Sequence, residues 1–108
     1  MKTVAHDTAI RVRYADTDQM QIVYNGKYLE YFEVGRTELL RAHGMTYAEF
    51  ERSGTRLPLV EAHCRFHHPA RYDDMIIVHS AVHAIPRSTM RIDYEVRRES
   101  DSMLIATG

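Results

Sequence analysis

The chain has 108 residues and a mass of 12.6 kDa, which is enough for one domain but not for two independent cores. Hydrophobic residues make up 44% and charged residues 27%, a balance typical of a folded chain. The 14 basic and 15 acidic side chains give a formal net charge of -1, which argues against a nucleic-acid-binding domain. The single cysteine, Cys64, excludes an intrachain disulfide framework and a Cys-rich zinc module.

The hydropathy of the sequence predicts neither a membrane span nor a secretory signal. The apolar runs, such as residues 75–78, are too short to span a bilayer. Residues 1–7 contain no apolar stretch of the kind found in a secretory signal. We therefore expect a cytoplasmic protein without a membrane span.

The first elements in chain order are a strand and a loop. Apolar and polar residues alternate over residues 10–14, which predicts a half-buried strand. Residues 15–23 show neither a helical nor a strand period, and they carry Asp16, Thr17 and Asp18. This segment is predicted to be a loop.

One long amphipathic helix follows. Its apolar stripe has helical spacing and consists of Tyr28, Phe32, Gly35 and Leu39. Asn25 is a good N-cap residue and Gly44 a good stop signal. A glycine inside a helix costs about 1 kcal/mol. Gly35 on the apolar stripe therefore predicts a close approach between the helix and the surface on which it packs.

The second half of the chain is predicted to be mainly strands. A capping box at residues 46–49 and a glycine at position 54 predict a short second helix. Alternation then predicts strands over residues 60–67, 75–84 and 90–97, and another that begins at residue 103. The turns at residues 69–74, 86–88 and 99–101 are short, so consecutive strands should pair antiparallel. The predicted fold class is α+β, with an antiparallel sheet curled around one central helix.

Asp18 is the first candidate for chemistry. It lies a few residues before the predicted start of the long helix, where backbone N–H groups and the positive end of the helix are available. A carboxylate beside such a helix end provides two parts of an acyl-transfer site. From the residues alone, however, a role as a cap or turn residue is the more common one for such an aspartate.

The stretch from Asp16 to Leu29, together with Phe32-Glu33 and residues 36–38, resembles the signature of hot-dog-fold thioesterases. It is most similar to the YbgC-like branch of the 4-hydroxybenzoyl-CoA thioesterase family. Residues 69–74 resemble a turn of that family, and the resemblance runs from about Ile10 to the last residue. It implies a single hot-dog domain over residues 1–108. Because the last strand and tail continue further in the family, we expect the C-terminal end to be truncated.

The resemblance implies an acyl-CoA thioesterase that releases a carboxylic acid and free CoA. Asp18 corresponds to the family's catalytic carboxylate, a general base or a nucleophile. The backbone around Tyr24 and Asn25 would polarise the thioester carbonyl, although the family often has His or Tyr at the position of Asn25. Gln21 stands where the family has glycine, so it either narrows the acyl pocket or adopts a backbone conformation that favours glycine. Related enzymes place basic residues near Arg87 and Ser88 against the CoA phosphates; a solvated turn is the alternative.

Two other functions remain open on the sequence. One is a thioesterase that acts on acyl-carrier-protein substrates. The other is a hot-dog module that binds acyl or lipid ligands without turnover, which the departures at Gln21 and Asn25 would suit. The chain has no Gly-x-Ser-x-Gly motif and no phosphate-binding loop, so a serine hydrolase and a nucleotide-hydrolysing enzyme are not supported.

We expect neither a metal nor a cofactor. His63 and His67 share one strand face, as do His79 and His83, but residues four apart on a strand are about 13 Å apart. These histidines are predicted to line a polar sheet face, and Cys64 is predicted to be a small buried hydrophobe rather than a nucleophile. Unpaired sheet edges predict a homodimer, or a homotetramer built from two dimers, and the family resemblance implies sites between subunits.

Overall fold

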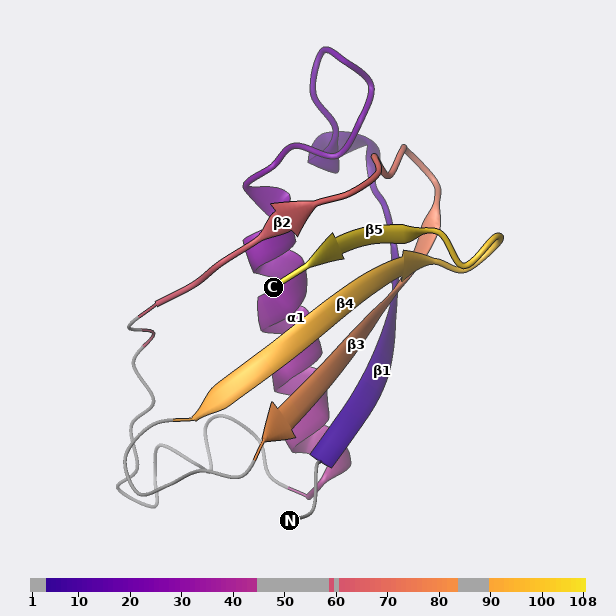
Figure 1. The fold of residues 1–108 in the computed structure, drawn as a ribbon. Coiled ribbons are helices and arrows are strands. Elements are labelled where there is room, and N and C mark those ends of the chain that lie inside the picture. The colour runs from indigo at the N-terminus through magenta and orange to yellow at the C-terminus, as the bar shows by residue number, and fades with distance from the viewer. Residues whose placement is uncertain (1–3, 45–58, 60, 84–89) are drawn as a thin grey trace.

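The computed structural model describes residues 4–44, 59, 61–83 and 90–108. Its strands are β1 (Val4–Arg11), β2 (Arg65–Phe66), β3 (Met75–His83), β4 (Arg91–Arg98) and β5 (Leu104–Thr107). One helix, α1 (Lys27–Ala42), follows a short 3₁₀ turn at Tyr14–Asp16. The five strands form one antiparallel sheet in the order β1-β3-β4-β5-β2, and α1 lies across one face of it (Figure 1). This architecture confirms the predicted α+β class.

Helix α1 packs closely on the centre of the sheet at Gly35. A Cβ atom at this position would lie 2.6 Å from the Ser80 Oγ and 2.8 Å from the Val78 Cγ1, both on β3. At such short distances the neighbouring atoms would have to shift, so glycine is the residue that allows α1 to lie this close to β3. The predicted stripe residues on α1 are all buried, and Gly44 follows the helix with φ +84°. The predicted close approach and the predicted stop are both confirmed.

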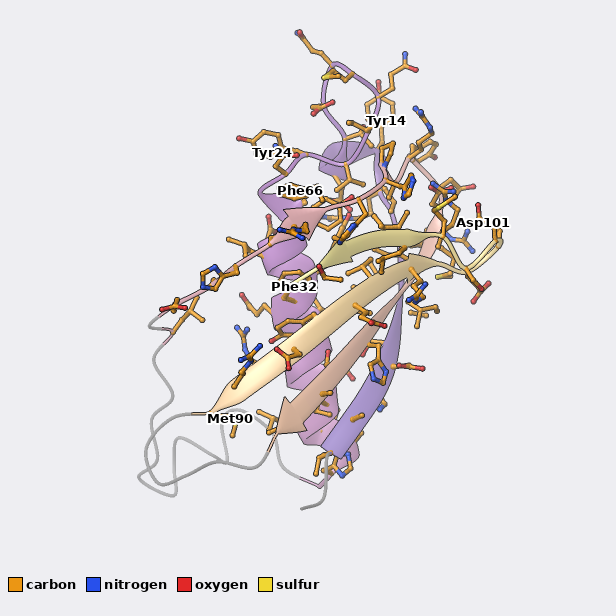
Figure 2. The ribbon with its side chains drawn as sticks, in the orientation of Figure 1. Tyr14, Tyr24, Phe32, Phe66, Met90 and Asp101 are labelled. Atoms are coloured by element: carbon orange, nitrogen blue, oxygen red, sulfur yellow. The ribbon has the colours of Figure 1, made fainter. Side chains whose placement is uncertain are left out.

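The core lies between α1 and the inner face of the sheet. Register pairs Val78 of β3 with Val96 of β4, and Val96 with Ala106 of β5. All three side chains are fully buried. Phe32 lies on α1 (Figure 2). Its ring stacks on the Tyr94 ring of β4, with centroids 4.4 Å apart and planes inclined by 10°. The alternation predicted for these strands thus places their apolar residues toward the helix.

Three boundaries differ from the prediction. Strand β1 begins at Val4 rather than near residue 10, and its inward positions include His6 and Thr8, which weaken the apolar pattern. Strand β2 contains only two residues instead of the eight-residue strand predicted over 60–67. The N-cap of α1 is Gly26, not Asn25, and no side chain caps the helix there. The predicted second helix and the turn at residues 86–88 lie outside the described residues.

Candidate functional site

A hairpin loop carries Asp18. Thr17 and Val23 form an isolated antiparallel bridge across its base. The Asp18 N–H donates to the Ile22 carbonyl at 3.0 Å, and the Gln21 N–H donates to the Asp18 carbonyl at 2.9 Å. Gln21 has φ +63°, in the left-handed region. This is the bonding pattern of a short hairpin loop that ends on a left-handed residue, a position where glycine is preferred.

Gln21 occupies a backbone conformation that favours glycine. The sequence left open whether this residue narrows a pocket or occupies a backbone position that favours glycine. The positive φ confirms the second interpretation. The Gln21 side chain is exposed, and its role toward an acyl group stays a prediction.

The Asp18 carboxylate is half-buried and held at one oxygen. Its Oδ1 accepts the Met20 N–H at 2.8 Å, which fixes the side chain against its own loop. Among the residues that the structure describes, no ion pair engages this carboxylate, and its Oδ2 accepts no hydrogen bond. One oxygen is therefore oriented by the protein while the other is free to act on a bound molecule.

The loop leads directly to the N-terminus of α1. The Val23 N–H donates to the Ala70 carbonyl at 2.8 Å, and the Lys27 N–H donates to the Tyr24 carbonyl at 2.9 Å. Within the described part of the chain, the N–H groups of Asn25 and Gly26 donate no hydrogen bond. These two amides lie at the positive end of the helix, where an oxygen that develops negative charge is stabilised.

Tyr24 does not fit its predicted role. Its N–H donates to the Asp16 carbonyl at 2.9 Å, so this amide is already occupied in the folded chain. The backbone groups available to polarise a carbonyl are thus those of Asn25 and Gly26. Sequence reasoning missed this shift by one residue because it placed the N-cap at Asn25 instead of Gly26.

A second carboxylate, Asp16, lies beneath the loop and is 2% exposed. Its Oδ2 accepts the Arg13 N–H at 3.1 Å and the Tyr31 hydroxyl at 2.8 Å. Its Oδ1 accepts the Arg13 guanidinium at 3.0 Å, and the Lys27 ammonium lies 3.8 Å away. Burial alone would raise the pKa of Asp16, but the donors from Arg13 and Tyr31 outweigh burial and hold the pKa below its ordinary value. Burial and the adjacent Asp16 charge raise the pKa of Tyr31.

The remaining predicted site residues lie elsewhere or outside the description. Arg87 and Ser88, predicted to meet the CoA phosphates, lie outside the described residues. Cys64 is half-buried rather than buried as predicted; it packs against the core, and burial raises the pKa of its thiol. Over residues 4–44, 61–83 and 90–108, no group of three or more His, Cys, Asp or Glu side chains is placed to hold a metal ion. His67 and His79 instead contact Thr107 and Asp7.

Two shallow cavities open on the sheet, away from the loop. One, of about 480 Å³, lies at the β2 edge and is lined by His63, Cys64, Arg65, Thr107 and Gly108. The other, of about 260 Å³, lies on the outer face and is lined by Asp7, Ile77, His79, Glu95 and Arg97. Asp18 lines neither cavity.

Comparison with known proteins identifies the family. The model of the thioesterase-like superfamily matches residues 12–108. The chain belongs to this superfamily. It is 42% identical over 71 residues to YneP of Bacillus subtilis, which is named as a candidate acyl-CoA thioesterase. That match covers 66% of this chain and 51% of YneP, so the chain spans about half the length of this relative.

Two further similarities cover nearly the whole chain. The acyl-CoA thioester hydrolase YbgC of Escherichia coli O157:H7 is 24% identical over 104 residues, which are 96% of this chain and 78% of YbgC. The crystal structure of DHNA-CoA thioesterase from Staphylococcus aureus superposes with a TM-score of 0.88 at 29% identity, and covers 95% of this chain and 68% of that one. The family and hot-dog fold expected from the sequence are confirmed.

None of the described helices is long and apolar enough to cross a membrane.

Proposed function

We propose that this chain hydrolyses acyl-CoA thioesters, with Asp18 as the catalytic carboxylate. The observation that carries the proposal is the pairing of two features in one short segment. Asp18 has one oriented oxygen and one uncommitted oxygen. Just before α1 begins at Lys27, the N–H groups of Asn25 and Gly26 have no acceptor among the described residues. Membership of the thioesterase-like superfamily and the names of YneP and YbgC support the reaction type.

The arrangement supports two routes that both begin at Asp18. As a general base, the carboxylate takes a proton from water, whose oxygen attacks the thioester carbonyl carbon. As a nucleophile, it attacks this carbon itself and forms a mixed anhydride that water then hydrolyses. In both routes the carbonyl oxygen becomes negative, the bond from carbon to sulfur breaks, and CoA leaves as a thiolate that takes up a proton. The N–H groups of Asn25 and Gly26 would stabilise the negative oxygen.

Substrate contacts belong to the same proposal. Arg87 and Ser88 would bind the phosphates of CoA, because a guanidinium and a hydroxyl both donate to phosphate oxygens. The exposed Gln21 side chain would border the acyl group, since it projects from the loop that holds Asp18.

The proposed active form is a homodimer or a homotetramer. Strands β1 and β2 are the two edges of the sheet, and their outward backbone groups are open to pairing. Asp18 lines neither of the two cavities described above, and we propose that a second copy supplies a wall of its site. On dilution, the thiol release rate per chain should fall together with the dimer content, which light scattering measures. A fully active monomer would contradict this assembly.

Thiol release tests the proposed reaction. The wild-type chain is incubated with acyl-CoAs of varied length and with aromatic acyl-CoAs, and the free thiol is measured. The same acyl group on a carrier protein forms a parallel arm, since that thioester has a pantetheine arm but no adenine nucleotide. Turnover on CoA substrates supports the proposal. Turnover of the carrier-protein substrate alone would favour an acyl-carrier-protein thioesterase. Saturable binding of acyl-CoA without thiol release would indicate a module that binds acyl ligands without turnover.

A further inference from the structure

Asp16 is a buried charge for which the proposed reaction has no use. Its carboxylate is 2% exposed and both of its oxygens accept hydrogen bonds, so it cannot take a proton from water. A buried carboxylate is costly unless its partners are well placed. Asp16 is such a buried carboxylate, and it lies only two residues before Asp18.

The contacts of Asp16 join the two halves of the candidate site. Its side chain accepts the Tyr31 hydroxyl from α1, at 2.8 Å. Its backbone carbonyl accepts the Tyr24 N–H at 2.9 Å, immediately before Asn25. Asp16 also directly precedes the hairpin that is closed by the Thr17–Val23 bridge and carries Asp18. One residue thus connects the carboxylate loop, the segment with the two free amides and the body of the helix.

We propose that Asp16 and Tyr31 act as a positioning pair that fixes the Asp18 loop relative to the N-terminus of α1. The proposal rests on the proposed role of Asp18. Neither residue of the pair needs to touch the substrate. The hydrogen bond between them sets where the Asp18 carboxylate stands with respect to the Asn25 and Gly26 amides. A displacement of about 1 Å between reacting groups can cost about 100-fold in rate.

Tyr31→Phe tests the pair with the smallest possible change. It removes only the hydroxyl and leaves the ring, which packs edge-on against the Tyr28 ring with centroids 5.7 Å apart. We expect kcat for an acyl-CoA to fall about 10- to 100-fold with little change in KM, because the base is misplaced but the binding surface is kept. Amide hydrogen exchange at Asp18 and Gln21 should accelerate, because the hairpin loses its anchor.

Tyr28→Phe is the matched control. Tyr28 and Tyr31 lie on the same helix, are 3% and 5% exposed, and would each lose one phenolic oxygen. Only Tyr31 contacts Asp16. The control should shift the denaturation midpoint by a similar amount, yet keep wild-type kcat and loop exchange. Equal losses of kcat in the two variants, in proportion to stability, would overturn the proposal and leave a structural role only.

A double variant provides a second, independent outcome. Asp16→Asn keeps one oxygen acceptor but removes the charge, so it should also lower kcat. If the two side chains act as one unit, Tyr31→Phe should cost much less in the Asp16→Asn background than in the wild type. Effects on kcat that simply multiply would contradict a shared role. Absence of thiol release by the wild type would refute the proposed function instead, and the exchange rates of the loop amides would then still decide whether the pair holds the loop.

Discussion

Replacement of Gln21 by glycine and by alanine separates the backbone from the side chain at this position. Gln21 occupies the left-handed region at φ +63°. Such a conformation costs an L-residue about 1–2 kcal/mol, and glycine escapes this cost. Glycine loses about 0.4–1 kcal/mol through the greater entropy of its unfolded chain. Gln21→Gly should therefore raise the free energy of unfolding by roughly 0.5–1 kcal/mol.

Gln21→Ala removes the same side chain beyond Cβ but keeps the backbone cost. Alanine should leave the unfolding free energy close to that of the wild type, within about 0.5 kcal/mol, as for other exposed positions. Chemical denaturation of the three proteins measures the difference. If alanine stabilised the chain as much as glycine, the argument from the positive φ would be refuted. Thiol release with a range of acyl-CoAs tests the side chain separately, because a pocket role predicts a wider substrate range in both variants.

Three further changes test the fold and the site. Gly35→Ala should lower the unfolding free energy by about 1 kcal/mol. The steric clash of the new methyl group with Ser80 costs about 1–3 kcal/mol, which exceeds the gain of about 1 kcal/mol in helix propensity. A stabilised variant would argue against the close approach. Asn25→Ala should retain most activity and stability, since its side chain caps nothing and its backbone is the proposed donor; a rise of about 2.7–4 kcal/mol in the activation barrier would show that the side chain itself reacts. Folding lowers the pKa of Asp16 below its ordinary value of 3.8, so the ionised carboxylate stabilises the folded chain at a pH above 3.8, and this stabilisation is lost as the pH falls through the folded pKa. The free energy of unfolding of Asp16→Asn should therefore depend less on pH than that of the wild type below about pH 4. Parallel acid-unfolding curves would contradict this.

The long helix and the sheet were predictable because their patterns are strong and self-consistent. The stripe on α1 and the alternation in β4 each place large apolar residues on one face, and burial follows directly. Strand β2 shows the limit of such reasoning. Its pairing with β5 covers two residues, Arg65 opposite Thr107 and Phe66 opposite Ala106, although the alternation in the sequence is longer. An alternating sequence becomes a strand only where a neighbouring strand lies beside it.

The candidate site was predictable only in part. Its location before α1 followed from the residue types and from the family resemblance, and in the structure Asp18 is half-buried there. Two aspartates, Asp16 and Asp18, stand within three residues, and no local pattern distinguishes the buried one from the accessible one. That distinction depends on Arg13 and Tyr31, and the latter is fifteen residues away along the chain. The free amides are those of Asn25 and Gly26 instead of Tyr24 and Asn25, because the Tyr24 N–H donates to the Asp16 carbonyl.

The most direct measurement of the central claim is the thiol release rate of Asp18→Asn. Asp101→Asn is the matched control; Asp101 lies in the loop between β4 and β5 (Figure 2). Asp101 accepts the Met103 N–H at 3.0 Å, just as Asp18 accepts the Met20 N–H at 2.8 Å. Both variants keep an oxygen for this turn bond and remove one negative charge from a loop. Loss of a catalytic carboxylate predicts a fall in kcat of about 10²–10⁴-fold for Asp18→Asn, with the fold intact and with near wild-type kcat for Asp101→Asn. Wild-type kcat in Asp18→Asn would contradict the account.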